Sequence, residues 1–141
     1  MTRKRIVVTG EPKGKSRPRF ADGHAYTPRA TVDYEKRIKS EWMRQTKGFK
    51  FEGRPALALE VKAYSQPPQS ESKKKRTAML AGNLRPKKKP DFDNIAKIIG
   101  DALNGVAYAD DTQIVFAAIE KYWGEPARVE ITITDVEEVY P

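Results

Sequence analysis

The sequence predicts a single α+β domain in which a mixed β-sheet packs against helices. Segments with apolar residues at every second position, typical of half-buried strands, occur together with segments of helical spacing. The chain has 141 residues, which is enough to bury one hydrophobic core and too few for two independent ones. We therefore expect residues 1–141 to form one domain.

The N-terminal part predicts a strand and a hairpin. The β-branched run at residues 6–9 is followed by Gly10 and Pro12, so it reads as a strand that enters a basic loop. Residues 17–27 are typical of a hairpin whose three-residue turn, 21–23, places Gly23 at a positive φ angle.

A long amphipathic helix should follow the hairpin. Thr27 is placed to cap it, with Pro28 at its first helical position. Tyr34, Ile38 and Trp42 then recur every four residues and define the buried face. We expect this helix to end at Gly48, because glycine commonly terminates helices.

The remaining elements follow from the same two spacings of apolar residues, the alternating spacing of strands and the three-to-four-residue spacing of helices. Residues 56–64 alternate as a half-buried strand, and Ser70 is placed to cap a short cationic helix that ends at Leu80. A second amphipathic helix spans 93–103, and residues 112–119 and 128–134 predict two strands.

One face of the helix at 93–103 is polar. At about 100° per residue, its polar side chains fall within an arc of about 80°. They are Asp93, Lys97, Asp101 and Asn104.

Composition favours a polyanionic partner. The formal charge is +8, from 27 Lys and Arg against 19 Asp and Glu, which makes nucleic acid a better candidate than an acidic membrane surface. There is no cysteine, so disulfides and thiolate chemistry are excluded and the cytoplasm is the expected location. The sequence shows no signal-peptide core, no membrane span and no phosphate-binding glycine loop, so we expect neither membrane association nor a nucleotide cofactor.

Acidic residues gather between a lysine run and the helix at 93–103. Asp91 and Asp93 are separated by one residue, and Asp110 and Asp111 lie just before the following strand. Magnesium needs only a few protein oxygens, so Asp91, Asp93 and one member of the 110–111 pair suffice to bind it. Lys97 lies one turn beyond Asp93, where its ammonium group can stabilise charge on a phosphate.

Each of these residues also has a structural explanation. An aspartate at a helix start commonly caps free backbone amides, and a lysine run is commonly a solubilising surface. Asp101 can simply pair with Lys97, one turn away. The co-occurrence of all these residues within residues 87–111 favours the metal site.

The same residues resemble the RusA family of Holliday junction resolvases. The resemblance lies in the order and spacing of residues 89–97, 101–103 and 110–114, and it extends to residues 12–13, 17–20, 26–28 and 34–35 as in the phage and prophage branch. The 103–110 segment is about a residue shorter than in some relatives. Either Asp110 or Asp111 can therefore align with the third carboxylate, and we prefer Asp111. Lysines stand before Asp91 where some members carry arginines, which loses bidentate phosphate contacts.

The resemblance implies a Mg²⁺-dependent endonuclease, with Mn²⁺ as a substitute metal, that makes paired nicks in four-way DNA junctions during recombination and repair. It implies a homodimer, which matches the approximate two-fold symmetry of a junction. It also implies catalytic and metal-ligating roles for Asp91, Asp93 and Asp111, and a catalytic role for Lys97.

Basic residues elsewhere are candidates to contact DNA phosphates, since a nuclease site needs a cationic approach surface. They are Arg17, Arg19, Lys73, Lys74, Lys75, Arg76, Lys87, Lys88 and Lys89. Phe20 can stack on an unpaired base, although a place in the core is the expectation. The only histidine, His24, is expected in the hairpin without a catalytic role. Trp42, Phe49 and Phe51 are candidates for a dimer interface, with core burial preferred.

Two other functions stay open. The chain can be a non-catalytic nucleic-acid-binding protein whose aspartates are helix caps, and dependence of activity on Mg²⁺ would separate this from a nuclease. It can also be a nuclease that prefers flaps or other branched DNA, which only a panel of substrates would reveal.

Overall fold

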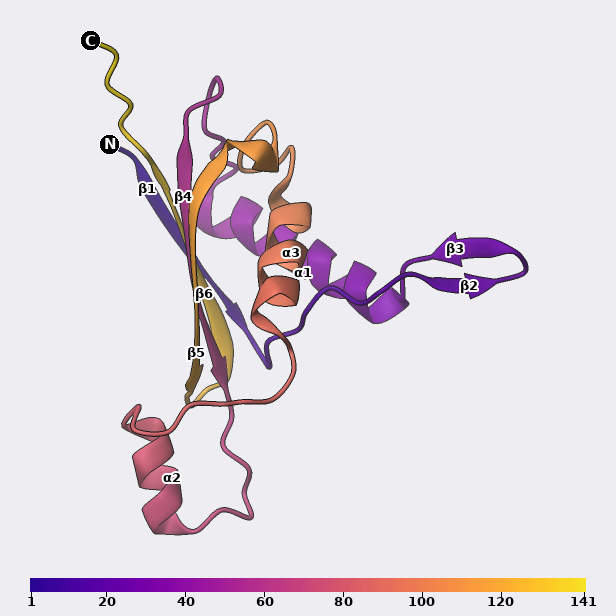
Figure 1. The fold of residues 1–141 in the computed structure, drawn as a ribbon, viewed down its shortest axis with the longest axis vertical. Helices are drawn as coiled ribbons and strands as arrows, with labels where there is room; N and C mark the ends of the chain where they lie inside the picture. Colours follow the sequence, from indigo (N-terminus) through magenta and orange to yellow (C-terminus); the bar gives the residue numbers. More distant parts are fainter.

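The computed structural model describes residues 1–141 as a mixed four-stranded sheet with two helices packed on one face (Figure 1). The strand order is β1-β6-β4-β5, with β4 and β5 parallel and the other neighbours antiparallel. The strands are β1 (Arg3–Thr9), β4 (Leu57–Ser65), β5 (Ile114–Trp123) and β6 (Arg128–Asp135). The predicted α+β class with a mixed sheet is confirmed.

The two long helices cover only one face of the sheet. They are α1 (Arg29–Thr46) and α3 (Phe92–Leu103). The buried side chains of α1 include Tyr34, Ile38 and Trp42, as the four-residue spacing predicts. These residues form one core with apolar residues of α3 and with alternate residues of the strands.

The opposite face of the sheet is polar. It includes Arg5, Glu60, Lys62 and Glu130, and Arg5 pairs with Glu130 at 3.2 Å. The alternation of β4, in which Leu57, Leu59, Val61 and Ala63 are buried, explains why one face has the core and the other has charges.

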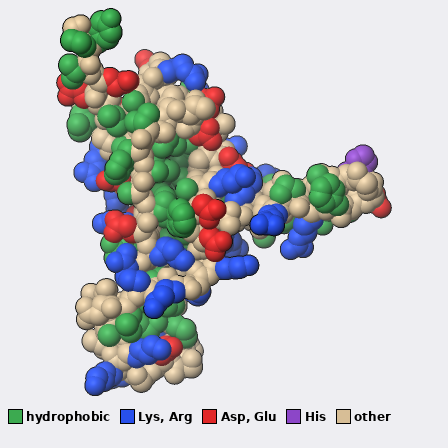
Figure 2. Space-filling model, viewed as in Figure 1, with side chains coloured by type: hydrophobic (Ala, Val, Ile, Leu, Met, Phe, Trp, Pro, Cys, Tyr) green, Lys and Arg blue, Asp and Glu red, His purple; other side chains and the backbone are tan.

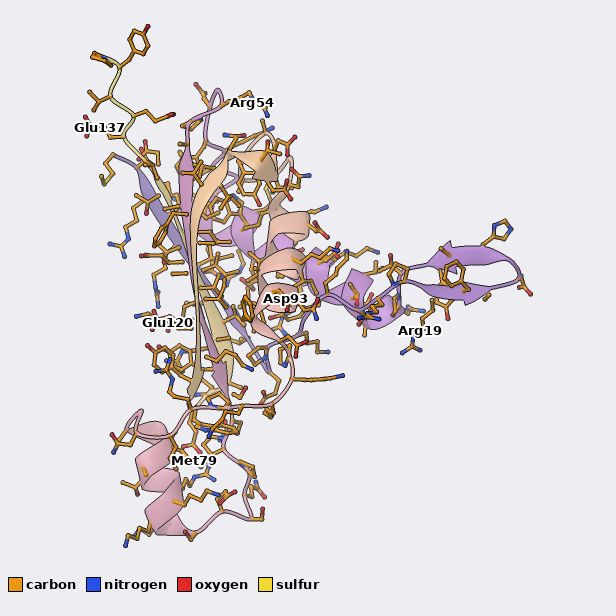
Figure 3. All side chains as sticks on the ribbon, in the orientation of Figure 1. Arg19, Arg54, Met79, Asp93, Glu120 and Glu137 are labelled. Atoms are coloured by element: carbon orange, nitrogen blue, oxygen red, sulfur yellow. The ribbon has the colours of Figure 1, made fainter.

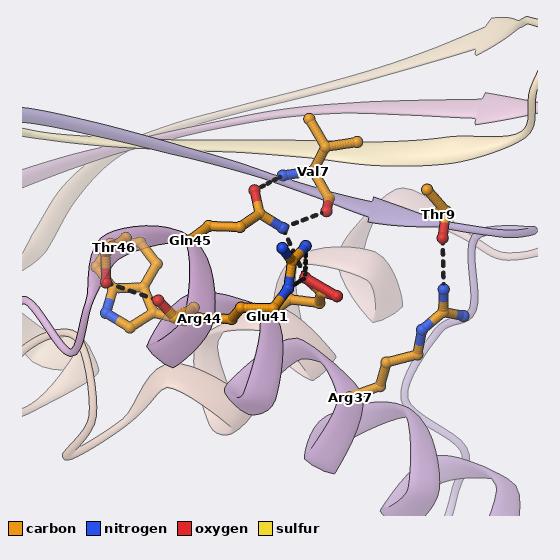
Figure 4. A network of polar contacts seen from close by, with 8 residues as sticks. Val7, Thr9, Arg37, Glu41, Arg44, Gln45 and Thr46 are labelled. Carbon is orange, nitrogen blue, oxygen red and sulfur yellow. Dashed lines mark hydrogen bonds and ion pairs between the residues drawn. The ribbon is translucent and has the colours of Figure 1, made fainter.

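Side chains of α1 cover the outer edge of β1 (Figure 4). The side-chain amide of Gln45 accepts from the backbone nitrogen of Val7 at 2.9 Å and donates to its carbonyl oxygen at 2.7 Å. Arg37 donates to the hydroxyl of Thr9 at 2.7 Å. Backbone groups that are already satisfied cannot readily pair with another chain, so α1 covers this edge at Val7.

Two pieces project from the body (Figure 1). One is the hairpin formed by β2 (Arg19–Ala21) and β3 (His24–Tyr26), and the other is α2 (Lys73–Leu80). The predicted three-residue turn is wrong. Ala21 pairs with His24, and the two-residue turn has φ of 52° at Asp22 and 77° at Gly23, which is the pattern of a type I′ turn.

The predicted helix caps are shifted. Pro28, and not Thr27, occupies the N-cap position of α1, and no side chain caps that helix. Ser72, and not Ser70, caps α2 by accepting from the backbone nitrogen of Lys75. The predicted strand at 112–119 begins later because residues Asp111–Gln113 form a 3₁₀ helix, η1. No helix combines the length and the apolar character that crossing a lipid bilayer requires.

Candidate active site

The N-terminal end of α3 presents two free carboxylates. Asp91 holds the N-cap position, but its side chain accepts no capping hydrogen bond. Asp93 lies in the first turn, at the position labelled in Figure 3. Both residues are exposed. Asp91 therefore occupies the position of a cap without the hydrogen bond of one, and both carboxylates remain available to a ligand.

A basic hollow surrounds these carboxylates. It has a volume of about 540 Å³ and is lined by Lys87, Lys88, Lys89, Asp91, Phe92, Asp93 and Lys121. The ammonium of Lys121, on β5, donates to the carbonyl oxygen of Lys88 at 2.6 Å. This bond ties the lysine loop to the sheet, so the cationic wall is held close to the acidic pair.

A second hollow lies further along the same face of α3. It has a volume of about 370 Å³, and its lining includes Lys97, Gly100, Asp101 and Asp111. The Oδ2 atom of Asp111 lies 3.9 Å from the position that a Cβ atom would take on Gly100. Lys97, which lines this hollow, is exposed. It lies one helical turn from Asp93.

Asp110 and Asp111 have different environments. Asp110 caps η1, accepting from the backbone nitrogen of Thr112 at 3.1 Å, and its own backbone nitrogen donates to Gln113 at 2.9 Å. The hydrogen bond from Thr112 lowers the pKa of Asp110. Partial burial raises the pKa of Asp111, and the neighbouring carboxylates of Asp110 and Asp101 raise it further. Asp110 is thus occupied by a structural bond, whereas Asp111 is the carboxylate that lies in the hollow.

The structure does not bring the predicted carboxylates together as one cluster. No group of three or more His, Cys, Asp or Glu side chains is close enough to hold a metal ion. Asp93 and Gly100, beside which Asp111 lies, are seven residues apart, or about 10 Å along the helix axis. The roles of Asp91, Asp93 and Asp111 as ligands stay predictions.

The donor chemistry at the first end of the helix nonetheless fits magnesium. Asp91 and Asp93 line one hollow and offer only oxygen atoms. Magnesium in proteins is often held by one or two carboxylates, completed by waters and substrate phosphate. A pair of carboxylates in a cationic hollow meets that requirement.

Asp101 does not pair with Lys97, as the sequence suggested, but with Lys15. The ammonium of Lys15 lies 3.1 Å from Asp101 and 2.5 Å from Glu35 on α1. Partial burial lowers the pKa of Lys15, but the two carboxylates outweigh it and the pKa is raised. This clamp joins the N-terminal loop to both helices. Sequence reasoning missed it because the three residues are far apart in the chain.

The predicted phosphate contacts fall in three places (Figure 2). Arg17 and Arg19 are exposed on the hairpin and its base, and Lys87, Lys88 and Lys89 are exposed beside the acidic pair. On α2, Lys73 and Lys74 are exposed, whereas Lys75 pairs with Glu71 at 3.3 Å and Arg76 pairs with Glu125. Whether they contact DNA stays a prediction, and the two paired residues of α2 also have structural partners.

The aromatic residues considered for a dimer interface or for base stacking differ in burial. Trp42 and Phe51 are buried, and Phe49 is partly buried against the same core, so the core position preferred for these residues over a dimer interface is what the structure shows. Phe20 is 79% exposed, so the expectation that it lies in the core is wrong. His24 lies in the hairpin, as expected.

Comparison with known proteins agrees with this arrangement. A family model described as endodeoxyribonuclease RusA matches residues 9–134. The chain belongs to the RusA family. The match covers every helix, β4, β5 and nearly all of β6, but only the last residue of β1. The resemblance read from the residue spacing is therefore confirmed, and the chain is a member of a family of DNA endonucleases.

A protein of Bacillus subtilis (strain 168), described as uncharacterized protein YqaN, is also similar to this RusA-family chain. The two are 34% identical over 141 residues, which cover 94% of this chain and 96% of the relative. The similarity therefore extends over nearly the whole length of both chains.

Proposed function

We propose that this RusA-family protein is a Mg²⁺-dependent endonuclease that resolves four-way DNA junctions by paired nicks, in recombination and repair. One observation carries the proposal: Asp91 and Asp93 present unpaired carboxylates in a lysine-lined hollow, with Lys97 on the same face of the helix. A site for a cation lies beside a site for a phosphate backbone.

Each group of residues has a distinct part in this proposal. The net charge of +8 attracts the DNA, and Lys87, Lys88 and Lys89 hold phosphates beside the acidic pair. The ammonium of Lys97 reaches the scissile phosphate and stabilises the negative charge that develops on its oxygens.

Asp91 and Asp93 would hold the magnesium ion. Asp111 would act as the third carboxylate from the second hollow, which requires the two hollows to approach each other when the ion and the DNA are bound. When bound, the metal supplies charge stabilisation and a more acidic water for attack on phosphorus. Asp111 suits this role better than Asp110 because its carboxylate is not used as a cap.

A single substitution tests the proposal. Asp93→Asn should lower the rate of nicking of a synthetic mobile four-way junction at least about 100-fold, because the carboxylate charge is lost from the cation site. Binding in Ca²⁺ or EDTA and the thermal midpoint should stay unchanged, because Asp93 is exposed. Wild-type nicking by the variant would remove Asp93 from the site. Asp33→Asn, on the exposed surface of α1, is the matched control.

The homodimer is part of the proposal, and the first half of the β5 edge is a candidate for it, whereas further along Arg85 donates to the carbonyl oxygen of Lys121 at 2.6 Å. The first half exposes apolar side chains, with Val115 64% and Phe116 54% exposed. A bulge in the β4–β5 pairing lies at Val115, opposite Leu57 and Ala58. Antiparallel pairing of two β5 edges would be self-complementary, as a two-fold interface requires.

Solution mass tests this interface. Wild-type protein should have the mass of a dimer by light scattering, and Phe116→Lys should be a monomer, because a charge on an edge strand opposes pairing. Val139→Lys, at an exposed apolar residue of the C-terminal segment, should remain a dimer. A monomeric wild type, or a dimeric Phe116→Lys variant, would exclude pairing through β5.

The second candidate is a basic protein that binds nucleic acid without cutting it. The separation of Asp111 from the Asp91 and Asp93 pair favours this candidate, since no three-acid cluster is present. Mg²⁺-dependent nicking of any DNA substrate would exclude it. A panel of four-way junctions, flaps and forks would then separate junction resolution from the cutting of other branched DNA.

A further inference from the structure

We propose that the β2–β3 hairpin is a branch-point probe, in which Phe20 stacks on a base exposed at the centre of branched DNA. Arg17 and Arg19 would hold the adjoining phosphates. This inference rests on the proposed function and deepens it, because it assigns the recognition of branched DNA to one element.

The hairpin has no packing of its own to explain its apolar residues. All residues of β2 and β3 are exposed, and the two strands pair only with each other. Figure 1 shows the hairpin extending away from the sheet and helices. An isolated two-stranded hairpin is marginally stable in water, and an exposed large apolar side chain at its centre points to a partner.

Phe20 has the geometry of a stacking group. Its cross-strand neighbour is Ala25, so the side chain beside it on that face of the hairpin is small and leaves the ring 79% exposed. Arg19 and Tyr26 face each other on the opposite side. Aromatic side chains bind unpaired bases through their π-faces without sequence preference, which suits a junction of variable sequence.

Charge identifies the partner as a polyanion. The segment from residue 13 to 29 includes Lys13, Lys15, Arg17, Arg19 and Arg29, with Asp22 as its only acidic residue. A second copy of this chain, with a net charge of +8, is a poor electrostatic match for it. Sites that bind unpaired nucleic acid usually combine basic residues with an exposed aromatic ring.

The base of the hairpin forms a wall of the candidate active site. Residues 14–17 line a hollow of about 570 Å³ together with Lys89, Pro90, Asp91 and Asn94. The same DNA molecule can therefore contact both the hairpin and the acidic pair. This favours DNA over a lipid surface as the partner of the hairpin.

The attachment of the base to α3 is close and well bonded. The backbone nitrogen of Lys15 donates to the carbonyl oxygen of Asn94 at 2.9 Å, and the Lys15 side chain contacts Asp101 at 3.1 Å. A Cβ atom on Gly14 would lie only 2.9 Å from the Cβ atom of Asn94. The foot of the hairpin is therefore fixed to the helix that carries the nuclease site. A nucleobase stacked on Phe20 would then set the distance from the branch point of the DNA to the nick.

The experiment uses 2-aminopurine, a base whose fluorescence rises when it is unstacked. It is placed beside the crossover of a four-way junction and at the same sequence position in a linear duplex, and both are titrated with full-length protein in EDTA. Wild-type protein should raise the fluorescence of the junction and not of the duplex. Phe20→Ala should remove the rise and weaken junction affinity roughly tenfold, with duplex affinity unchanged.

Two further variants complete the test. Phe20→Trp should restore the junction affinity of the wild type, because the ring is replaced by another stacking ring. Tyr140→Ala removes a still more exposed aromatic ring, 98% exposed, from the C-terminal segment and should behave as wild type. Since both positions are exposed, each variant should keep the circular dichroism spectrum of the wild type.

The outcomes separate the two proposals. Equal fluorescence with Phe20→Ala and wild type, or no rise with a wild type that nicks junctions in Mg²⁺, overturns the branch-point probe and leaves the nuclease standing. A wild type that neither nicks junctions nor prefers them to duplex overturns the proposed function, and the probe with it.

Discussion

At the N-terminal end of α3 the carboxylates of Asp91 and Asp93 are exposed and the fold does not use them, whereas near its C-terminal end the carboxylates are engaged. There Asp101 pairs with Lys15, Asp110 caps η1, and Asp111 lies against its acidic neighbours. Asp101 and Asp110 thus contribute to stability near one end of the helix, whereas Asp91 and Asp93 are free for a ligand at the other. Substitutions at the clamp and at Asp93 should therefore separate stability from catalysis, Asp111→Asn should affect both, and Asp93→Asn is the reference for the free end.

The largest effect on stability is expected at the clamp. Lys15→Met should lower the free energy of unfolding by about 1–3 kcal/mol, because Glu35 and Asp101 lose their shared partner and then repel each other. Urea denaturation at pH 7 measures this change. The matched control is Lys13→Met, an exposed lysine of the same loop, which should stay within about 0.5 kcal/mol of wild type. Equal stability of the two variants would mean that the clamp contributes nothing.

A smaller effect, of opposite sign, is expected at Asp111. Its pKa is raised in the folded protein, so ionisation costs stability as the pH rises through the interval between the unfolded and folded pKa values, and the full cost remains above that interval. Asp111→Asn should therefore raise the thermal midpoint slightly at pH 7, and this gain should shrink as the pH is lowered through the same interval.

Nicking by Asp111→Asn should nonetheless fall, because the carboxylate is lost from the proposed cation site. Thermal melts at several pH values, together with junction cleavage in Mg²⁺, test both statements. If this variant is less stable than wild type at pH 7, charge repulsion does not dominate the contribution of Asp111 to stability. Unchanged nicking would remove Asp111 from the proposed ligands.

Local periodicity predicted the elements that carry the site. The helix expected at 93–103 begins only one residue earlier, because its apolar residues repeat strongly and it lies between Pro90 and Asn104-Gly105. The strand expected at 56–64 is found at 57–65 for the same reason. The exposed positions of Asp93 and Lys97 follow from their places on the polar arc of that helix.

Tertiary relations were beyond the reach of local patterns. Lys15, Glu35 and Asp101 belong to a loop and two helices, so no sequence window contains the clamp. Phe20 was expected in the core because aromatic residues usually are, but its strand has only three residues and extends away from any surface it could pack on. The spacing of 91, 93 and 111 predicted a cluster, whereas the rise of the helix separates Asp111 from the other two.

The close contact at Gly14 divides the N-terminal segment into an invariable and a changeable part. A side chain at residue 14 would collide with Asn94 and Pro90, so the segment can be neither lengthened nor bulked out at that point without displacing it from the helix. Beyond residue 17 nothing surrounds the chain. Residues 18–27 can therefore be exchanged as a cassette between relatives, and hybrids built in this way would transfer a preference for one DNA shape while the cutting centre of the recipient stays intact.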